Sequence, residues 1–315
     1  MYKLTAHIII KTATKTWNIH KITSCEIERD IENITATCVV VLPRKTKWHN
    51  ETGIPIKRGD KITVKLGYDD NFETAFTGYI RSVGTKTPLE ITCEDEMYLL
   101  KNTAATKKSY PEADLETLLK EQLPSDIKFN IFGEQKFGKW IVNCDTVSQL
   151  LGELRENGFL FYFKDGDLNA GAIFDSKSKG KKQVFREGKN IIDSSDLEWY
   201  NPDDISLRIK ACGTDANGYK MEIEVGDKDG ELRSFFKYNT TKQALETEAN
   251  AKLIEWKVGG LTGSFTTFGA KLVWLLDTIK VQLENCEIGD YKVRKNNITF
   301  GTDGYRQNIT IQGKE

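Results

Sequence analysis

The sequence lacks any long run of apolar residues. Its longest N-terminal run is Ile8, Ile9 and Ile10, far short of the apolar core of a signal peptide, and no later stretch approaches a membrane span. We therefore expect synthesis in the cytoplasm and no membrane insertion. The chain also lacks an excess of one charge: the net charge at pH 7 is −1, so no basic surface predicts nucleic-acid recognition.

Cysteine and histidine are few and follow no ligand pattern. The six cysteines form no C-x-x-C pair, and several lie in strand-like runs, so we expect thiols in the core. They are Cys25, Cys38, Cys93, Cys144, Cys212 and Cys286. The three histidines, His7, His20 and His49, show no metal-ligand spacing. We expect no metal and no cofactor.

Catalytic motifs are also missing. Residues 133–139 match the first seven places of a phosphate-binding loop, but Trp140 stands where a magnesium-binding Ser or Thr is required, and an apolar strand follows instead of a helix. Asp227 and Asp229 resemble the start of a calcium loop, but no bidentate acid follows, and a hairpin turn is the better interpretation. We predict that the chain is not an enzyme, and name no catalytic, cofactor-binding or metal residue.

What the sequence does contain is an internal repeat of strand patterns. Apolar residues stand two, four and six places after Asp60, and again after Asp277. Residues 91–94 and 309–312, which resemble each other, begin 31 and 32 residues after those two aspartates. Alternating triplets also arise in any β-rich sequence, but spacing and phase agree together here. The agreement favours two β-domains of one design.

Helical signals interrupt the strands in two regions. Asp114 is the expected N-cap of a helix that Pro124 ends, and Thr146 with Gln149 forms the capping box of a second helix before Asn157 and Gly158. An aromatic hairpin over residues 159–170 follows.

A third helix is expected behind a capping box of Thr240 and Gln243, with an apolar stripe and an end at Gly259–Gly260. We predict a mainly β, α+β fold: two tube-like antiparallel β-barrel domains with a small α+β insertion between them. The expected boundaries are 1–103 for the first β-domain, 104–200 for the middle domain and 201–315 for the second β-domain.

The order of these segments resembles the late control protein D family of phage tail proteins, which form the baseplate hub. It is also similar to the N-terminal hub half of the type VI secretion spike protein. The resemblance rests on the strand launch in residues 56–67 with 76–80, the helix and aromatic hairpin in 146–166, the alanine-rich helix 244–253, and the closing strands 289–293 and 304–311. The match covers nearly the whole chain.

The resemblance implies a structural baseplate hub of a contractile phage tail or related injection system. It implies a homotrimer that joins the hexameric tail tube to a trimeric spike, with other baseplate proteins as further partners. Type VI spike proteins continue beyond the hub, whereas this sequence ends at Glu315, so we expect the spike to be a separate protein. Synthesis would occur in the bacterial cytoplasm, followed by assembly into a tail or particle.

Other functions remain open at this point. A tail-tip hydrolase would need two carboxylates and a sugar cleft, and the sequence singles out no such set. A carbohydrate-binding adhesin and the tail-tip hub of a non-contractile tail are further alternatives.

Overall fold

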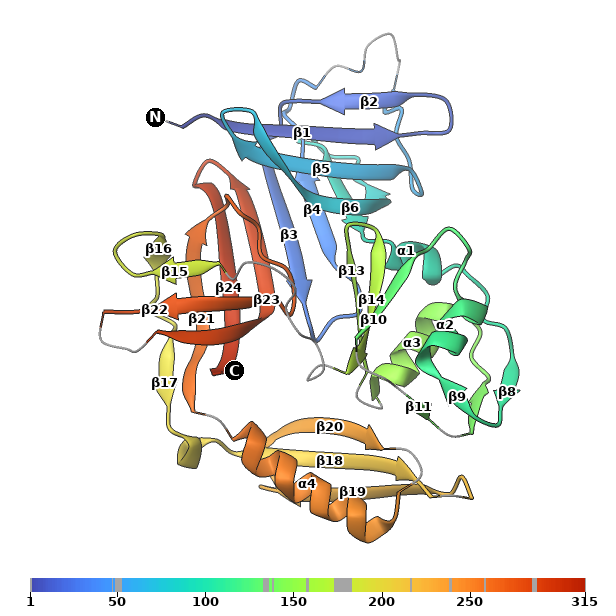
Figure 1. The fold of residues 1–315 in the computed structure, drawn as a ribbon. Coiled ribbons are helices and arrows are strands. Elements are labelled where there is room, and N and C mark those ends of the chain that lie inside the picture. Colours follow the sequence, from blue (N-terminus) through green and yellow to red (C-terminus); the bar gives the residue numbers. More distant parts are fainter. Residues whose placement is uncertain are drawn as a thin grey trace.

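The computed structural model is mainly β and contains four α-helices in the part of the chain that it describes (Figure 1). It describes residues 2–46, 48, 53–132, 136–137, 139–156, 159–172, 183–215, 217–237, 240–257, 259–284 and 288–314. One sheet of 14 strands connects the two ends of the chain, and eleven of them follow one path, in the order β16-β21-β24-β23-β3-β4-β7-β6-β5-β1-β2. Most pairs in it are antiparallel, as predicted for the fold class.

The N-terminal strands form one half of this sheet. They are β1 (Leu4–Lys11), β2 (Thr16–Ile19), β3 (Ser24–Asp30), β4 (Thr37–Val41), β5 (Lys61–Tyr68), β6 (Asn71–Val83) and β7 (Glu90–Glu94). The alternation after Asp60 is confirmed, since Ile62, Val64 and Leu66 are fully buried. They belong to a core that also contains Cys25, Cys38 and Cys93. The apolar face of the predicted meander therefore forms the inside of this half.

The C-terminal strands form the other half. They are β21 (Gly260–Phe268), β22 (Thr278–Gln282), β23 (Gly289–Gly301) and β24 (Gly304–Lys314). Three short strands pair with them: β15 (Val184–Arg186) with β22, and β16 (Ile191–Asp193) and β17 (Glu198–Tyr200) with β21. These three fall in the range predicted for the middle domain but extend the C-terminal half of the sheet. The pairings among the described residues follow an open path and do not close into a ring.

The middle segment packs its helices around an aromatic hairpin. Its helices are α1 (Met97–Leu100), α2 (Leu115–Gln122) and α3 (Val147–Glu156). Its strands are β8 (Lys108–Tyr110), β9 (Ala113–Asp114), β10 (Phe129–Phe132), β11 (Lys136–Phe137), β12 (Trp140–Val142), β13 (Phe159–Lys164) and β14 (Asp167–Ala172). The predicted N-caps are confirmed: Asp114 accepts from the Thr117 amide at 2.7 Å, and the Thr146 hydroxyl from the Gln149 amide at 3.3 Å.

A separate layer of three strands and one helix lies below the two halves in Figure 1. It contains β18 (Leu207–Thr214), β19 (Lys220–Gly226), β20 (Glu231–Lys237) and α4 (Lys242–Trp256), and a short 3-10 helix, Pro202–Asp204, precedes it. The predicted stripe of α4 is confirmed, with Leu245, Ala249 and Trp256 buried against this sheet.

Two details of this layer differ from the prediction. The capping residue of α4 is Thr241, whose hydroxyl accepts from the Ala244 amide at 3.2 Å, because Thr240 is held by β18 through the Thr214 carbonyl. The turn at residues 227–230 does not form a hairpin, because β19 and β20 lie on opposite sides of β18. The turn crosses the end of β18, where a side chain at Gly230 would collide with the Leu207 backbone.

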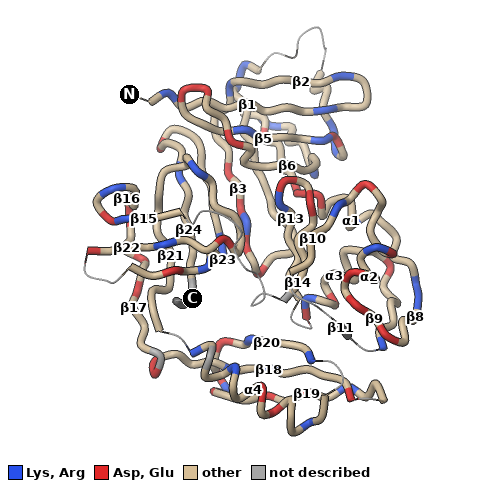
Figure 2. Tube along the Cα trace, in the orientation of Figure 1, with Lys and Arg blue, Asp and Glu red and all other residues tan. Residues whose placement is uncertain are grey.

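Several predicted features lie outside the described residues: the Asn157–Gly158 helix stop, His49 and Cys286. Within the described residues, four of the predicted core thiols are buried and Cys212 is half-buried. No helix among them is both long enough and apolar enough to cross a membrane. Figure 2 shows basic and acidic residues interspersed over every part of the fold.

Candidate assembly interface

The two halves of the large sheet begin their meanders with the same turn, which we call the launch turn. The first launch turn spans residues 57–60 and the second spans residues 274–277. The carboxylate of Asp60 accepts from the amide of Lys57 at 2.8 Å, and the carboxylate of Asp277 accepts from the amide of Trp274 at 2.9 Å. In both turns the aspartate amide donates back to the same residue, at 3.2 Å in each case. The residue before the aspartate has a positive φ, 90° at Gly59 and 62° at Leu276.

The strands after each turn also match in register. The amide of Ile80 donates to the carbonyl of Asp60, and its carbonyl accepts from the amide of Gly59. Val293 makes the same two hydrogen bonds with Asp277 and Leu276. Immediately after these two residues, β6 and β23 each contain a register shift, at Ile80/Ser82 and at Val293/Lys295. Beyond the shift, Val83 pairs with Ile91 of β7, just as Asn296 pairs with Ile309 of β24. The repeat read from the sequence therefore holds residue by residue.

The two halves are joined by a β-ladder between β3 and β23. Six antiparallel pairs run from Cys25–Phe300 to Asp30–Lys295. The Lys295 ammonium group lies 2.6 Å from the Glu28 carboxylate and 3.3 Å from that of Asp30, and these contacts hold its pKa above the usual value. Because β22 pairs only with the first part of β23, the second part is free to accept β3.

A second contact joins the halves at one end of this ladder. The two carboxylate oxygens of Glu73 accept from the amides of Lys271 and Leu272 at 3.0 and 2.9 Å. The hydroxyl of Tyr68 donates to the carbonyl of Tyr305 at 2.9 Å, and the two rings lie 5.6 Å apart. The loop before the second launch turn is thereby held by the β5–β6 hairpin of the first half.

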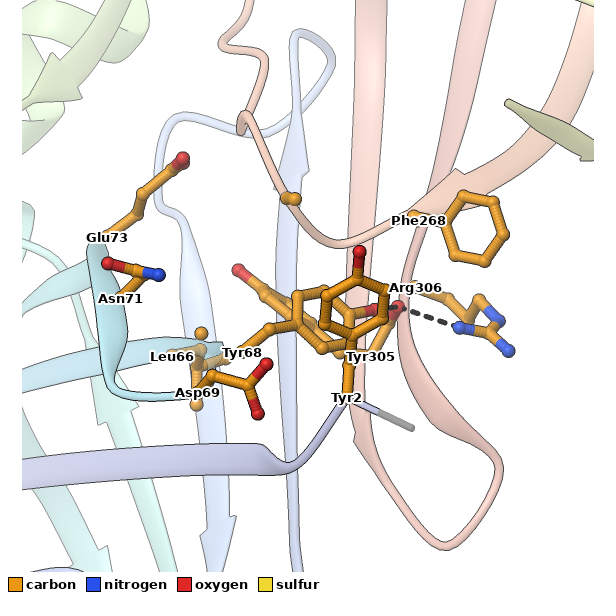
Figure 3. A pocket seen from close by; sticks show the side chains of 11 residues that line it. Tyr2, Leu66, Tyr68, Asp69, Asn71, Glu73, Phe268, Tyr305 and Arg306 are labelled. Carbon is orange, nitrogen blue, oxygen red and sulfur yellow. Dashed lines mark hydrogen bonds between the residues drawn. The ribbon is translucent and has the colours of Figure 1, made fainter. Parts of the chain in front are cut away.

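A cavity of about 520 Å³ opens beside this contact (Figure 3). Residues from both halves line it, among them Tyr2, Leu66, Tyr68, Phe268, Tyr305 and Arg306. The pKa of Tyr305 is raised, chiefly by burial, and its hydroxyl has no hydrogen-bond partner among the described residues. The cavity is an aromatic recess at the junction, and both acids that line it accept backbone hydrogen bonds: Asp69 from the amide of Lys3 and Glu73 from those of Lys271 and Leu272.

The middle segment is attached at the same junction. Arg155 of α3 donates to the carbonyl of Ile31 at 2.7 Å, and the ammonium group of Lys164 lies 3.3 Å from the Asp277 carboxylate. Ile31, Leu160 and Leu276 form a small buried cluster with one residue from each part. The three parts of the chain therefore meet around the end of β3.

The structure shows the surroundings of the residues that the sequence analysis considered as possible chemical sites. Asp227 accepts from the amide of Leu207 at 3.2 Å and lies 3.1 Å from the Lys257 ammonium group, so its carboxylate has a structural role. Trp140 begins β12, as its apolar surroundings predicted. No group of three potential metal ligands occurs within the described residues. The interface residues between the two halves were not identified from the sequence, because ladder partners far apart in a chain leave no local pattern.

No protein-family model and no curated protein matches this sequence. Solved structures do match. A tail protein from Neisseria meningitidis MC58 is 17% identical, with a TM-score of 0.65, over 98% of this chain and 96% of that one. The 43 kDa tail protein of prophage MuSo2 from Shewanella oneidensis is 18% identical, with a TM-score of 0.63, over 98% of both chains.

The structural similarity extends to a protein of a secretion system. A component of the type VI secretion system of E. coli is 10% identical, with a TM-score of 0.56, over 98% of this chain and 77% of that one. The fold is thus one shared by phage tail proteins and a type VI secretion component. The resemblance to tail hub proteins inferred from the sequence is confirmed at the level of the fold.

Proposed function

We propose that this chain is the structural baseplate hub of a contractile phage tail or a related injection particle. The observation that carries the proposal is the duplication: Asp60 and Asp277 close the same turn and start strands in the same register. The structural similarity to tail proteins and to a type VI secretion component supports it. Its role is mechanical, with no catalytic step.

Duplication gives the hub its ability to join different symmetries. Three chains with two tube-like β-domains each present six similar domains around a ring. Such a trimer can bind a hexameric tail tube on one side and a separate trimeric spike on the other, with other baseplate proteins around it. In this proposal residues 1–103 and 201–315 supply the two tube-like domains, β15, β16 and β17 extend the second of them, and the rest of residues 104–200 forms the middle domain between them.

The first test is the mass of the purified chain in solution, measured by light scattering. One chain is 35.8 kDa, so a homotrimer would have a mass of about 107 kDa. The second test is co-purification with the tube and spike proteins of the same particle, and imaging of particles for three copies at the tip. A folded monomer that binds neither tube nor spike would contradict the proposal.

A further inference from the structure

We propose that the outer edge of β16 and β17 in one copy of this chain binds the end of β6 in a second copy, by the same antiparallel pairing that joins β3 to β23 within the chain. This proposal rests on the proposed hub function and identifies the strands that would meet between subunits. Residues 191–200, which contain β16 and β17, belong to the second half of the sheet. Ser82 and Val83, at the end of β6, belong to the first half.

Residues 191–200 occupy the position in the second half that β3 occupies in the first. In the first half, Ser24 pairs with Val41 and Glu28 with Thr37 on β4. In the second half, Asp193 pairs with Thr266 and Glu198 with Thr262 on β21.

Since β4 and β21 both pair with the matched strands β7 and β24, these are equivalent positions. The equivalent segment has one extra residue and is interrupted by a turn in which the Leu197 amide donates to the Ser194 carbonyl at 3.0 Å. By this register Trp199 corresponds to Arg29, and Tyr200 to Asp30.

The end of β6 occupies the position of the β3-binding part of β23. The register shift after Ile80 matches the shift after Val293, so Ser82 corresponds to Lys295 and Val83 to Asn296. In the chain, Lys295 pairs with Asp30 and Asn296 with Arg29. Transferring these pairs to two copies predicts that Ser82 pairs with Tyr200, and Val83 with Trp199, of the neighbouring copy.

The side chains on the two equivalent edges differ in their exposed fraction, as expected if β3 is covered within the chain and the edge of β16 and β17 is covered only by a second copy. Arg29, inside the internal ladder, is 2% exposed, whereas its counterpart Trp199 is 49% exposed. Ile192 and Tyr200 on the same segment are 45% and 36% exposed. Among the described residues, β16 and β17 pair only with β21. An unpaired edge with exposed aromatic groups is a template for another strand, and aromatic residues are enriched at protein interfaces.

The charges near the two proposed surfaces are complementary, as they are at the β3–β23 ladder within the chain. Within the chain, the guanidinium of Arg294 lies 2.6 Å from the carboxylate of Glu32, two residues beyond the end of β3. The counterpart of Arg294 is Arg81, whose side chain is about half exposed and lies 3.4 Å from the carboxylate of Glu94 in its own chain. The residues that follow β17 include Asp203 and Asp204, which are exposed in the short 3-10 helix. Arg81 of one copy would therefore face these acids of the next.

A second copy is the occupant that this geometry favours, because each chain carries both surfaces at different places. Contacts between two unlike surfaces of identical chains are heterologous and form a closed ring when the rotation permits. The pairing is short, since β6 ends at Val83, so neighbouring loops must supply the rest of the contact.

Disulfide cross-linking tests the register directly. The double variants V83C/W199C and S82C/Y200C place thiols on the two predicted pairs. Neighbouring pairs in an antiparallel ladder alternate in Cα separation, so at least one of them lies at the spacing that a disulfide needs. We expect intermolecular disulfides and a covalent three-chain product on a non-reducing gel. The matched control, V83C/I192C, has an equally exposed thiol outside the register and should give no such product.

Two further samples complete the experiment. A mixture of the single variants V83C and W199C should give a linked two-chain product with the 83–199 bond identified by mass spectrometry. W199E should reduce the mass in light scattering from three chains to one, whereas I254E should not, because Ile254 is 79% exposed on α4, outside both surfaces. Circular dichroism checks that each variant is folded.

The outcomes separate this proposal from the hub proposal. A three-chain wild-type protein in which neither predicted pair cross-links overturns the strand pairing and leaves the hub function standing. A wild-type protein that is a monomer in solution and with its spike, and whose variants do not cross-link, overturns both.

Discussion

The guanidinium carbon of Arg29 lies 3.9 Å from the ring centre of Trp274, and this contact joins β3 to the second launch turn. Arg29 is buried, and desolvation lowers its pKa to about 10. One guanidinium nitrogen donates to the carbonyl of Ala75, and another has no hydrogen-bond partner among the described residues. The ring face of Trp274 is therefore a principal source of stabilisation for this charge.

We expect W274A to destabilise the protein by about 3 kcal/mol, because it removes a packed ring and leaves the Arg29 charge buried without it. R29M should be much milder, since it removes the charge together with its desolvation cost. Urea unfolding of the two single variants and the double variant measures the coupling, which we expect at about 1 kcal/mol or more. Equal and additive losses would contradict a specific contact between the two residues.

Sequence patterns predicted the local structure well where the signal was local. The caps at Asp114 and Thr146 and the alternation after Asp60 depend on residues within a few positions of each other. The repeat was visible because the same turn recurs at Asp277 with nearly the same distance to the strand that follows.

The parts that could not be predicted depend on distant partners. The β3–β23 ladder joins residues more than 260 positions apart, such as Asp30 and Lys295. The alternating patterns of β19 and β20 suited a hairpin, but the insertion of β18 between them is decided by tertiary packing around α4. Arg29 gave no signal, because a lone charged residue in an alternating strand is ordinarily at the surface.

The first launch turn can be tested at Asp60. Its side chain is buried, and its carboxylate is the acceptor for the Lys57 amide. We expect D60A to lower the free energy of unfolding by about 2 kcal/mol, because the variant leaves a backbone donor unsatisfied next to the core. Urea denaturation measures the loss. D303N, at an exposed hairpin position, is the control and should change stability by less than about 0.5 kcal/mol.

Asp95 should make stability depend on pH. Burial raises its pKa to about 7, although the amides of Ala36 and Met97 donate to its carboxyl oxygens and oppose the shift. The folded state therefore retains a proton that the unfolded chain loses near pH 4, so the stabilising contribution is complete below pH 4 and is lost as the pH rises to 7.

We expect the difference in free energy of unfolding between the wild type and D95N to fall by on the order of 4 kcal/mol between pH 4 and pH 8. Denaturant unfolding at several pH values measures this difference, which cancels the titration of other groups. A difference that stays constant, or that grows with pH, would show that Asp95 is ionised in the folded protein.

Glu73 provides a test of the contact between the two halves, because its two carboxylate oxygens are the acceptors for the amides of Lys271 and Leu272. In E73Q the new amide group cannot accept, so one backbone donor loses its partner. Since Glu73 is exposed, we expect a loss of only about 1 kcal/mol, seen as roughly fivefold faster hydrogen exchange at those two amides. The matched control is E90Q, the same chemical change at an exposed position of β7. Unchanged exchange in E73Q would show that the loop is held without this carboxylate, and the junction would then depend on the β3–β23 ladder and the ring contacts alone.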